Sequence, residues 1–332
     1  MHLPLTTPFF PDGRLNLRKL EQNTARYSLT PAAGLVVLGP TGEASLLSDE
    51  ETRQVLKTAL ESAASTKVLI AGASRNSLRG TLELIDNAAL LGYDAILLSA
   101  PSLPGLTPEE LRNHFQSIAD KSLLPIILEG KFQPELVVEL AFHHRILGLS
   151  SSFKDPKEIH FLLEKTAIVK RTITVTNVFA AFTGRMSSMK PSGLVSAESL
   201  AGGKTIAASS SHPAIKTREK SVSLQILAHN TETMLDDLKA GAVGAIPPFA
   251  AAAPQASYEV MAAWRDGDPA LAEEKQHRII DAIQLIEEKL GVAGLKYGCD
   301  LNGYFGGNPR LPLLPLSGNQ RAEIERLMRT LT

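Results

Sequence analysis

A carboxylate and an amine stand two residues apart at Glu129 and Lys131, directly after the apolar run 123–128. In an extended chain, residues two apart point to the same face, so these side chains can share one surface. Burial and a nearby partner can lower the pKa of a lysine until it acts as a nucleophile, with the glutamate as acid and base. The alternative is a solvated Glu/Lys pair on a loop. Lys154, just before an expected helix, is a second candidate amine, and its alternative is an ordinary surface residue.

A glycine-rich loop follows a second apolar run. Residues 35–38 read Leu-Val-Val-Leu, without polar alternation, which indicates a strand buried on both faces, as in a parallel sheet. Such a loop can turn backbone N–H groups and a hydroxyl toward a small acceptor. Ser48 and Glu51 then form a capping box that opens the next helix. The loop residues, which we expect to contact a substrate, are Gly39, Pro40, Thr41 and Gly42.

Other polar residues at strand ends give weaker signals. The run Ser150, Ser151, Ser152 contains hydroxyls, but no positioned histidine is near it in the sequence. His229 ends an expected strand, where it can face a site or belong to a turn and helix cap. His143 and its neighbour His144 stand at a helix end, where a positive charge suits the helix dipole. No histidine and carboxylate group has metal spacing, and no Gly-x-Gly-x-x-Gly follows a strand, so neither a metal nor a dinucleotide cofactor is indicated.

These residues are positioned by a regular alternation of strands and helices. We predict strands at 3–9, 35–38, 68–72, 95–99, 123–128, 146–149, 223–228 and 242–246. Helical patterns separate them at 15–27, 50–64, 77–91, 111–120, 134–143, 232–240 and 254–265. Strict alternation of this kind implies parallel strands with helical crossovers. Eight such units predict a (β/α)8 TIM barrel.

Two segments depart from this alternation. Residues 166–220 are rich in Thr, Ser, Gly and Ala, with β-favouring pieces at 171–178 and 204–208. This segment joins a helix to a strand, so we expect it at the end of the barrel opposite an active site, either as a hairpin or as a disordered excursion. The chain after 266 is helical, with one long amphipathic helix expected at 270–290. The predicted domains are a barrel over 1–265 with an insertion at 166–220, and a C-terminal helical region over 266–332.

Composition fits an enzyme-sized soluble chain. The 332 residues exceed the roughly 250 of a typical α/β barrel. A net charge of -1 and an isoelectric point near 6.7 argue against nucleic acid or an anionic membrane as a partner. Cys299 is the only cysteine, so we expect no stapling disulfide, a cytoplasmic location and a packed thiol. We find no secretory leader and no apolar run long enough to span a membrane.

The loop at Gly39–Gly42 with the following helix start resembles the dihydrodipicolinate synthase and N-acetylneuraminate lyase family. Further segments match that family in order: Thr7-Pro8-Phe9, residues 68–72, 92–98 and 241–246, and the run Arg310 to Leu316. The resemblance covers most of the chain. It implies a (β/α)8 barrel with a C-terminal helical appendage, no cofactor, and a site at the mouth, which is the end of the barrel where the strands terminate.

The resemblance also implies where the family's reacting groups would stand. In this family a lysine ending the sixth strand forms an imine with a 2-oxo acid, and a tyrosine ending the fifth strand relays protons. The corresponding residues here are Ser150 and Glu129, while Ser102 and Leu103 take the place of a tyrosine pair, and Pro40 replaces the first threonine of the loop. Thr41 is kept. A serine cannot form an imine, because only a primary amine can.

We therefore predict a lyase or aldolase-type enzyme with a non-standard site, acting on a pyruvate-like 2-oxo acid or a related small carboxylate. Its catalytic residues would be Thr41, Glu129, Lys131 and Ser150, with Lys131 as a relocated imine lysine. Further substrate contacts would come from the glycine loop, Ser102, His229 and Ile246. One alternative is a catalytically inactive barrel that binds a small acid or acts as an assembly partner. Another is imine-free hydration or dehydration using Glu129. The resemblance also implies a homo-oligomer, a dimer or tetramer.

Overall fold

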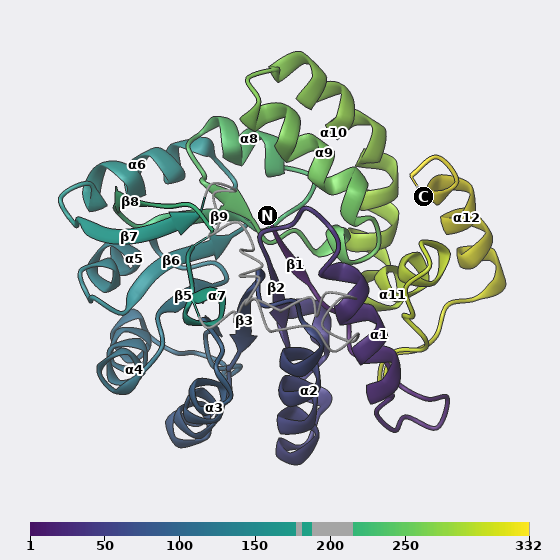
Figure 1. Ribbon diagram of the computed structural model, residues 1–332, viewed down its shortest axis with the longest axis horizontal. Helices are drawn as coiled ribbons and strands as arrows, with labels where there is room; N and C mark the ends of the chain where they lie inside the picture. The colour runs from purple at the N-terminus through teal and green to yellow at the C-terminus, as the bar shows by residue number, and fades with distance from the viewer. Residues whose placement is uncertain (177–180, 188–214, 332) are drawn as a thin grey trace, which may run out of the picture.

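In the computed structural model, which describes residues 1–176, 181–187 and 215–331, eight parallel strands form a nearly closed barrel (Figure 1). In chain order they are β1 (His2–Pro4), β2 (Gly34–Val37), β3 (Val68–Gly72), β4 (Ala95–Ser99), β5 (Ile126–Glu129), β6 (Ile146–Ser151), β9 (Gln225–Ala228) and β10 (Gly244–Ala245). Each strand pairs in parallel with the next one in this order. The expected (β/α)8 architecture is confirmed.

Helices follow the strands and form the outer layer of the barrel (Figure 1). They are α1 (Leu17–Tyr27), α2 (Asp49–Ser62), α3 (Leu78–Leu91), α4 (Pro108–Lys121), α5 (Pro134–Ala141), α6 (Pro156–Thr166), α8 (Met234–Lys239) and α9 (Pro254–Arg265). The predicted capping box of α2 is present, since Ser48 accepts from the Glu51 N–H and Glu51 accepts from the Ser48 N–H. These caps satisfy N–H groups that the first helical turn leaves unpaired.

Alternation along the strands separates two layers of apolar side chains. Val36, Ile70, Leu97 and Leu227 belong to a cluster inside the barrel. Their chain neighbours, such as Leu35, Leu69, Ile96 and Ile226, belong to a larger cluster shared with the surrounding helices. Successive side chains of a strand point to opposite faces, so each strand supplies both layers. This is why the strand sequences show near-continuous apolar runs.

The first strand is shorter than the sequence predicts. The expected strand covers residues 3–9, whereas β1 ends at Pro4. Beyond it, the Leu5 N–H still donates to the Val36 carbonyl (2.8 Å), and Phe9 forms an isolated antiparallel bridge with Leu15. Pro8 has no N–H to donate to a ladder, which explains why the regular strand does not continue through it.

The insertion forms a two-stranded antiparallel hairpin. Its strands are β7 (Arg171–Thr176) and β8 (Thr217–Val222), and a short helix, α7 (Gly184–Ser187), lies between them in the chain. Arg185 donates to the carbonyl oxygens of Lys67 (3.0 Å) and Ala63 (3.2 Å), which precede β3. The insertion therefore contacts the N-terminal end of the barrel, as expected. The β-favouring piece at 204–208 lies outside the described residues.

The C-terminal region packs on one side of the barrel (Figure 1). It contains α10 (Pro269–Ile283), a π-helical segment η5 (Gln284–Lys289), α11 (Gly291–Leu301) and α12 (Gly318–Met328). The single helix expected at 270–290 is thus an α-helix that continues as a π-helix. Cys299 on α11 is fully buried, and its Sγ donates to the Ala251 carbonyl (3.2 Å). Burial raises the pKa of this thiol to about 11, which fits a packed, unreactive cysteine.

Candidate active site

Three polar residues form a row at the mouth, at the ends of β4, β5 and β6. The strand register pairs Ser99 with Glu129, and Glu129 with Ser150. Paired residues of neighbouring parallel strands point to the same face, and strands lie about 4.8 Å apart. Leu97 and Ile127, two residues earlier on β4 and β5, face the interior of the barrel. The row therefore stands above the inner apolar layer.

Glu129 is the central and most perturbed member of the row. Its Oε2 accepts a hydrogen bond from the Ser99 hydroxyl (2.6 Å), while its buried Oε1 has no partner among the described residues. Burial raises the pKa of Glu129 to about 7, and the Ser99 hydrogen bond lowers it by a smaller amount. A carboxyl group with this pKa can both donate and accept a proton near neutral pH.

Ser150 and His229 add two further buried polar atoms. Ser150 is completely buried, and neither its Oγ nor the Nδ1 of His229 has a hydrogen-bond partner within the described chain. His229 follows β9, and its N–H donates to the Ser151 carbonyl (3.1 Å). Burial lowers the pKa of His229 to about 4, so the ring is neutral at pH 7. Unpartnered buried polar atoms are costly, and such atoms concentrate where a ligand can satisfy them.

The predicted glycine loop forms a tight turn after β2. Residues Pro40–Gly42 make a 3₁₀ turn, and Thr41 is buried while Pro40 is exposed. The Thr41 hydroxyl donates to the Leu5 carbonyl (3.1 Å), and the Thr7 hydroxyl donates to the Gly42 carbonyl (2.6 Å). The Thr41 proton is therefore engaged by the backbone, which leaves its oxygen lone pairs as acceptors.

A buried ion pair holds this loop against the C-terminal region. Glu43 directly follows the turn with a left-handed backbone (φ 52°), and its carboxylate pairs with the ammonium of Lys296 on α11. Lys296 also donates to the Asn308 carbonyl (3.1 Å), and its Nζ lies 4.4 Å from the centre of the Phe9 ring. The Arg310 N–H donates to the second Glu43 oxygen (2.8 Å). Non-glycine residues with positive φ cost free energy, so these contacts fix a strained turn.

A second, half-buried carboxylate joins the loops after β9 and β10. Glu287, in the π-helical segment, accepts from the Thr231 hydroxyl (2.5 Å), from the Thr231 N–H (3.3 Å) and from the Phe249 N–H (2.9 Å). Burial raises the pKa of Glu287 to about 7 despite these bonds. π-helical segments often occur at functional positions. Here the π-helical segment carries Glu287, whose carboxylate contacts the two mouth loops.

The structure brings together some of the sequence-predicted site residues and separates others. Glu129 and Ser150 are neighbours, whereas Lys131 is exposed and lines a hollow of about 180 Å³ together with Lys154, Leu149 and Leu162. Leu149 belongs to the outer layer, so this hollow lies outside the barrel wall. Gly130 has a positive φ of 116°, which ends the extended geometry on which the expected shared face depended.

Three further predicted contacts also have defined positions. Ser102 is exposed in the loop after β4, and its N–H donates to Asn76 (2.9 Å). Ile246 is fully buried in the inner cluster just after β10. Sequence reasoning missed Ser99, although a polar residue ending an apolar strand was the available signal. It also missed the pairing of Glu43 with Lys296, because nothing in the sequence links residues so far apart.

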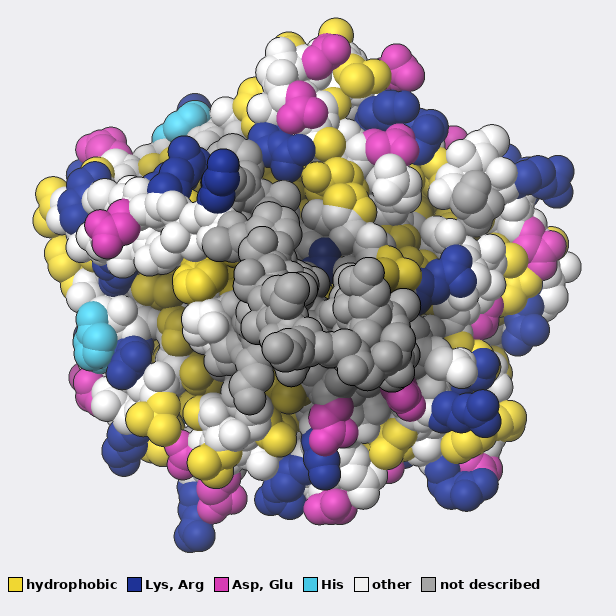
Figure 2. Space-filling model, in the orientation of Figure 1, with side chains coloured by type: hydrophobic (Ala, Val, Ile, Leu, Met, Phe, Trp, Pro, Cys, Tyr) yellow, Lys and Arg dark blue, Asp and Glu magenta, His cyan; other side chains and the backbone are white. Residues whose placement is uncertain are grey.

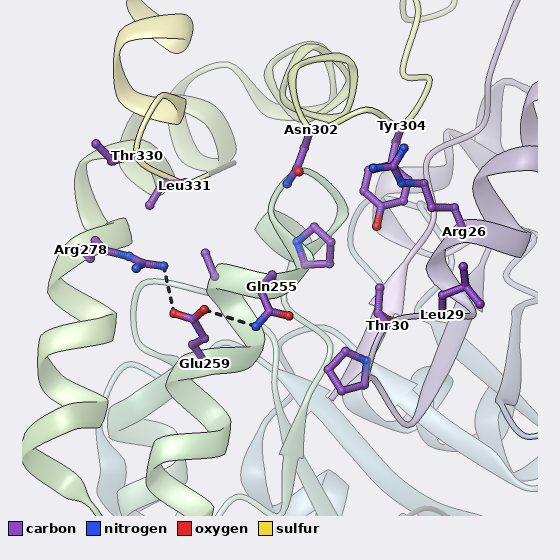
Figure 3. A pocket seen from close by; sticks show the side chains of 13 residues that line it. Arg26, Leu29, Thr30, Gln255, Glu259, Arg278, Asn302, Tyr304, Thr330 and Leu331 are labelled. Atoms are coloured by element: carbon purple, nitrogen blue, oxygen red, sulfur yellow. Dashed lines mark hydrogen bonds and ion pairs between the residues drawn. The ribbon is translucent and has the colours of Figure 1, made fainter.

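A separate pocket of about 510 Å³ lies on the flank of the barrel, beside α1, α9 and the C-terminal region (Figure 3). Its acidic residue, Glu259, already pairs with Arg278 (3.1 Å) and Lys275 (3.5 Å). Gln255 also donates to Glu259 (3.3 Å), as the dashed line in Figure 3 shows. The strand ends that carry Glu129 do not contribute to this pocket. We therefore place the candidate active site at the mouth.

Two classes of feature are not found within the described residues. No group of three or more His, Cys, Asp or Glu side chains in 1–176, 181–187 and 215–331 is arranged to hold a metal ion. No helix in the same ranges combines the length and apolar character that crossing a membrane requires.

Comparison with protein families gives a match over nearly the whole chain. The model of the dihydrodipicolinate synthetase family matches residues 1–199 and 183–331. The 4-hydroxy-tetrahydrodipicolinate synthase of Acidiphilium cryptum is 27% identical over 324 residues, which is 98% of this chain and 95% of that protein. The enzyme of the same name from Xanthomonas axonopodis pv. citri is 32% identical over 166 residues, 48% of this chain and 55% of that protein.

Solved structures show the same fold. The chloride-inhibited dihydrodipicolinate synthase from Acinetobacter baumannii, complexed with pyruvate, superimposes with a TM-score of 0.78 and 24% identity, covering 100% of this chain and 98% of that one. The N-acetylneuraminate lyase from Mycoplasma synoviae gives a TM-score of 0.76 and 19% identity, covering 100% of this chain and 98% of that one. At these identities the similarity supports the fold alone.

Proposed function

Because the chain belongs to the dihydrodipicolinate synthetase family, we propose that it is a lyase or aldolase-type enzyme acting on a pyruvate-like 2-oxo acid or a related small carboxylate. Relatives along its whole length are named as synthases, which supports an enzymatic role. The single observation that carries the proposal is the row of Ser99, Glu129 and Ser150 at the ends of β4, β5 and β6. In α/β barrels, active sites lie at this end.

Glu129 acts as the general acid and base in this proposal. Its carboxylate takes a proton from the carbon beside the substrate carbonyl, and the resulting enolate carries its negative charge on oxygen. The Ser150 hydroxyl on the next strand donates a hydrogen bond to that oxygen. A pKa of about 7 suits both halves of this exchange, because Glu129 can accept the proton and return it at neutral pH.

This route needs no imine. Ser150 cannot form one, and Lys131 is exposed and lines a hollow with outer-layer Leu149 rather than facing Ser99. Ser99 serves as a positioning residue, since its hydroxyl fixes Oε2 and leaves Oε1 toward the reacting carbon. The neutral His229 ring has a nitrogen, unpartnered within the described chain, that donates to the bound acid when it carries the proton, whereas the Thr41 proton is already engaged by the Leu5 carbonyl.

Proton exchange at pyruvate tests the proposal without a second substrate. Incubation of the protein with pyruvate in D₂O should replace the methyl protons by deuterium, which NMR follows directly. Glu129→Gln should slow this exchange by roughly 10²- to 10⁴-fold, the usual contribution of a general base. Glu109→Gln, at an exposed position in the first turn of α4, is the matched control and should leave the rate unchanged.

Two outcomes would contradict parts of the proposal. Borohydride reduction with pyruvate, followed by peptide mapping, should find no lysine adduct; an adduct at Lys131 would restore the imine route. Saturable pyruvate binding without any proton exchange would instead support a catalytically inactive barrel that binds a small acid. A physical argument favours the inactive barrel as the alternative: Ser150 stands where the family's reacting amine would be.

A further inference from the structure

The end of the barrel opposite the mouth contains a large cavity that the proposed function does not use. Its volume is about 1200 Å³, and it lies between the N-terminal ends of the strands and the insertion hairpin. Val68 and Ile127 line it from the barrel, while Ile173 and Phe182 line it from the insertion. This volume is slightly above the range of about 300 to 1,000 Å³ that is typical of pockets for small-molecule ligands.

Small residues at the inner positions of the strands open this cavity. Barrel interiors are usually filled by bulky branched side chains, which close the bottom of the barrel. Here the strands contribute Ala95, Gly148 and Gly244 to the lining. At Gly148 a side chain is sterically excluded, because a Cβ would lie 2.6 Å from the Gln225 carbonyl oxygen. The space therefore follows from the sequence of the strands themselves.

The lining combines an apolar wall with an excess of positive charge. Trp264, Tyr258 and Met261 of α9 supply aromatic and apolar surface. Among the described residues that line it, three have cationic side chains, namely Arg185, Lys220 and Arg265, of which Arg265 also pairs with Asp266 (3.3 Å). Asp94 is the carboxylate among these described residues, and its Oδ2 already accepts the Leu69 N–H (2.8 Å). Figure 2 shows this face of the molecule, with Lys and Arg side chains gathered beside the β7–β8 hairpin and hydrophobic side chains next to them.

A buried histidine at the same cavity lacks a partner. His2 on β1 lines the cavity, and its Nδ1 is buried with no hydrogen-bond partner within the described chain. In the tautomer with its proton on Nδ1 the ring can donate to an incoming acceptor, and in the other tautomer Nδ1 can accept from water. Apolar walls, a cationic rim and an unpartnered polar atom together define a site for a molecule with one apolar and one polar end.

We propose that this cavity binds an amphipathic anion, a small molecule with an apolar chain and a single carboxylate, of the fatty-acid class. The chain would occupy the space beside Ala95 and Ile127 inside the barrel, where apolar surface leaves water. The carboxylate would lie toward Lys220 on β8, where the positive potential favours an anion. This inference does not depend on the proposed reaction at the mouth.

The single tryptophan gives a direct readout. Trp264 is the only tryptophan in the chain and lines the cavity, so a ligand there should change its fluorescence. Titration with dodecanoate should give a saturable change with one molecule bound per chain, confirmed by calorimetry. Dodecanol, which has the same apolar chain without the charge, should bind roughly tenfold more weakly, and added salt should reduce the difference.

Two variants localise the site. Lys220→Gln should weaken dodecanoate binding about three- to ten-fold and leave dodecanol binding unchanged, because Lys220 acts through its charge. Ala95→Leu should weaken both ligands by filling the inner wall, and circular dichroism would check that this variant folds. Lys239→Gln on α8 is the matched control, since Lys239 does not line the cavity and should leave both affinities unchanged.

Several results would overturn the inference. These are a linear, non-saturable fluorescence change, equal affinity for dodecanoate and dodecanol, or dodecanoate binding that Lys220→Gln leaves intact. Competition between dodecanoate and pyruvate would also overturn it, because the two sites lie at opposite ends of the barrel. Glu129→Gln should leave dodecanoate binding unchanged, which separates a failure here from a failure of the proposed reaction.

Discussion

The two ends of the barrel differ in the side chains that line them. At the mouth, Glu129, Ser150 and His229 each have a buried polar atom without a partner within the described chain. At the opposite end, mainly small and apolar residues line a cavity, together with a few charged side chains and the Nδ1 of His2, unpartnered among the described residues. The mouth therefore carries groups whose protonation can change, while the other end offers space and apolar surface.

This difference shows that one strand can serve two purposes. On β4, Ala95 lines the cavity at the N-terminal end and Ser99 hydrogen-bonds Glu129 at the C-terminal end. Leu97 between them packs in the inner cluster and separates the two ends. Changes at the mouth should thus affect chemistry and pH dependence, and changes at the other end should affect ligand binding and local stability.

The largest effect should come from the ion pair that holds the glycine loop. Lys296 is 0% and Glu43 is 1% exposed by side chain, so Lys296→Met leaves a buried, unpaired carboxylate. We expect a loss of about 3 to 5 kcal/mol in the free energy of unfolding, measured by urea denaturation. Removal of both charges in Lys296→Met with Glu43→Gln should cost less than Lys296→Met alone.

An exposed ion pair serves as the control for this prediction. Lys239 and Glu273 lie 2.8 Å apart, with side chains 36% and 55% exposed. Lys239→Met should change stability by about 1 kcal/mol or less. If Lys296→Met lowers the free energy of unfolding no more than Lys239→Met does, the buried ion pair does not hold the mouth loop. The mouth would then lack the buried charged group that distinguishes it from the opposite end of the barrel.

Glu129→Gln should raise stability at alkaline pH. The pKa of Glu129 in the folded protein is about 7, above the ordinary glutamate value of 4.5, so the folded state binds more protons between these two pH values. Stability of the wild type therefore falls as pH rises from about 4.5 to 7, and this cost persists above 7. At pH 8 the variant should be more stable by on the order of 2 to 3 kcal/mol, and at pH 4 the two should be similar. Denaturant curves at both pH values measure this; equal stability at pH 8 would mean that Glu129 is not buried as an acid.

Arg185→Gln should loosen the opposite end without affecting the mouth. The variant loses hydrogen bonds to the carbonyls of Lys67 and Ala63, which we expect to cost about 1 to 2 kcal/mol of local stability. Amide hydrogen exchange should become faster in β7 and β8 and stay unchanged in β5. Pyruvate proton exchange should keep its wild-type rate. A slower rate would show that the two ends are coupled.

The smallest effect should follow from Ser99→Ala. The Ser99 hydroxyl lowers the pKa of Glu129, so its removal should raise that pKa further. The pH at which pyruvate proton exchange reaches half its maximum should move up by roughly half a unit to one unit. Thr66→Ala, at an exposed position in the turn before β3, is the control and should leave the profile in place. An unshifted profile in Ser99→Ala would remove Ser99 from the proposed mechanism.

Local pattern was sufficient for most of the fold. Apolar runs without alternation predicted buried parallel strands, and the capping box at Ser48 and Glu51 predicted the start of α2. Boundaries were less accurate where backbone chemistry intervened, as at Pro8, which lacks the N–H that a longer first strand would need. The π-helical segment at Gln284–Lys289 was not predicted, because its side-chain spacing resembles that of an α-helix.

The sequence by itself determined the barrel, the family and the residue types that end its strands. Tertiary structure alone decided which of those residues meet. Strand register placed Glu129 between Ser99 and Ser150, whereas the positive φ of Gly130 turned Lys131 away from them. Pairing across 253 positions between Glu43 and Lys296 likewise depends on how the C-terminal helices pack. Periodicity reports which face a side chain takes along one element, but contacts and burial, which set pKa, arise between elements that are distant in the chain.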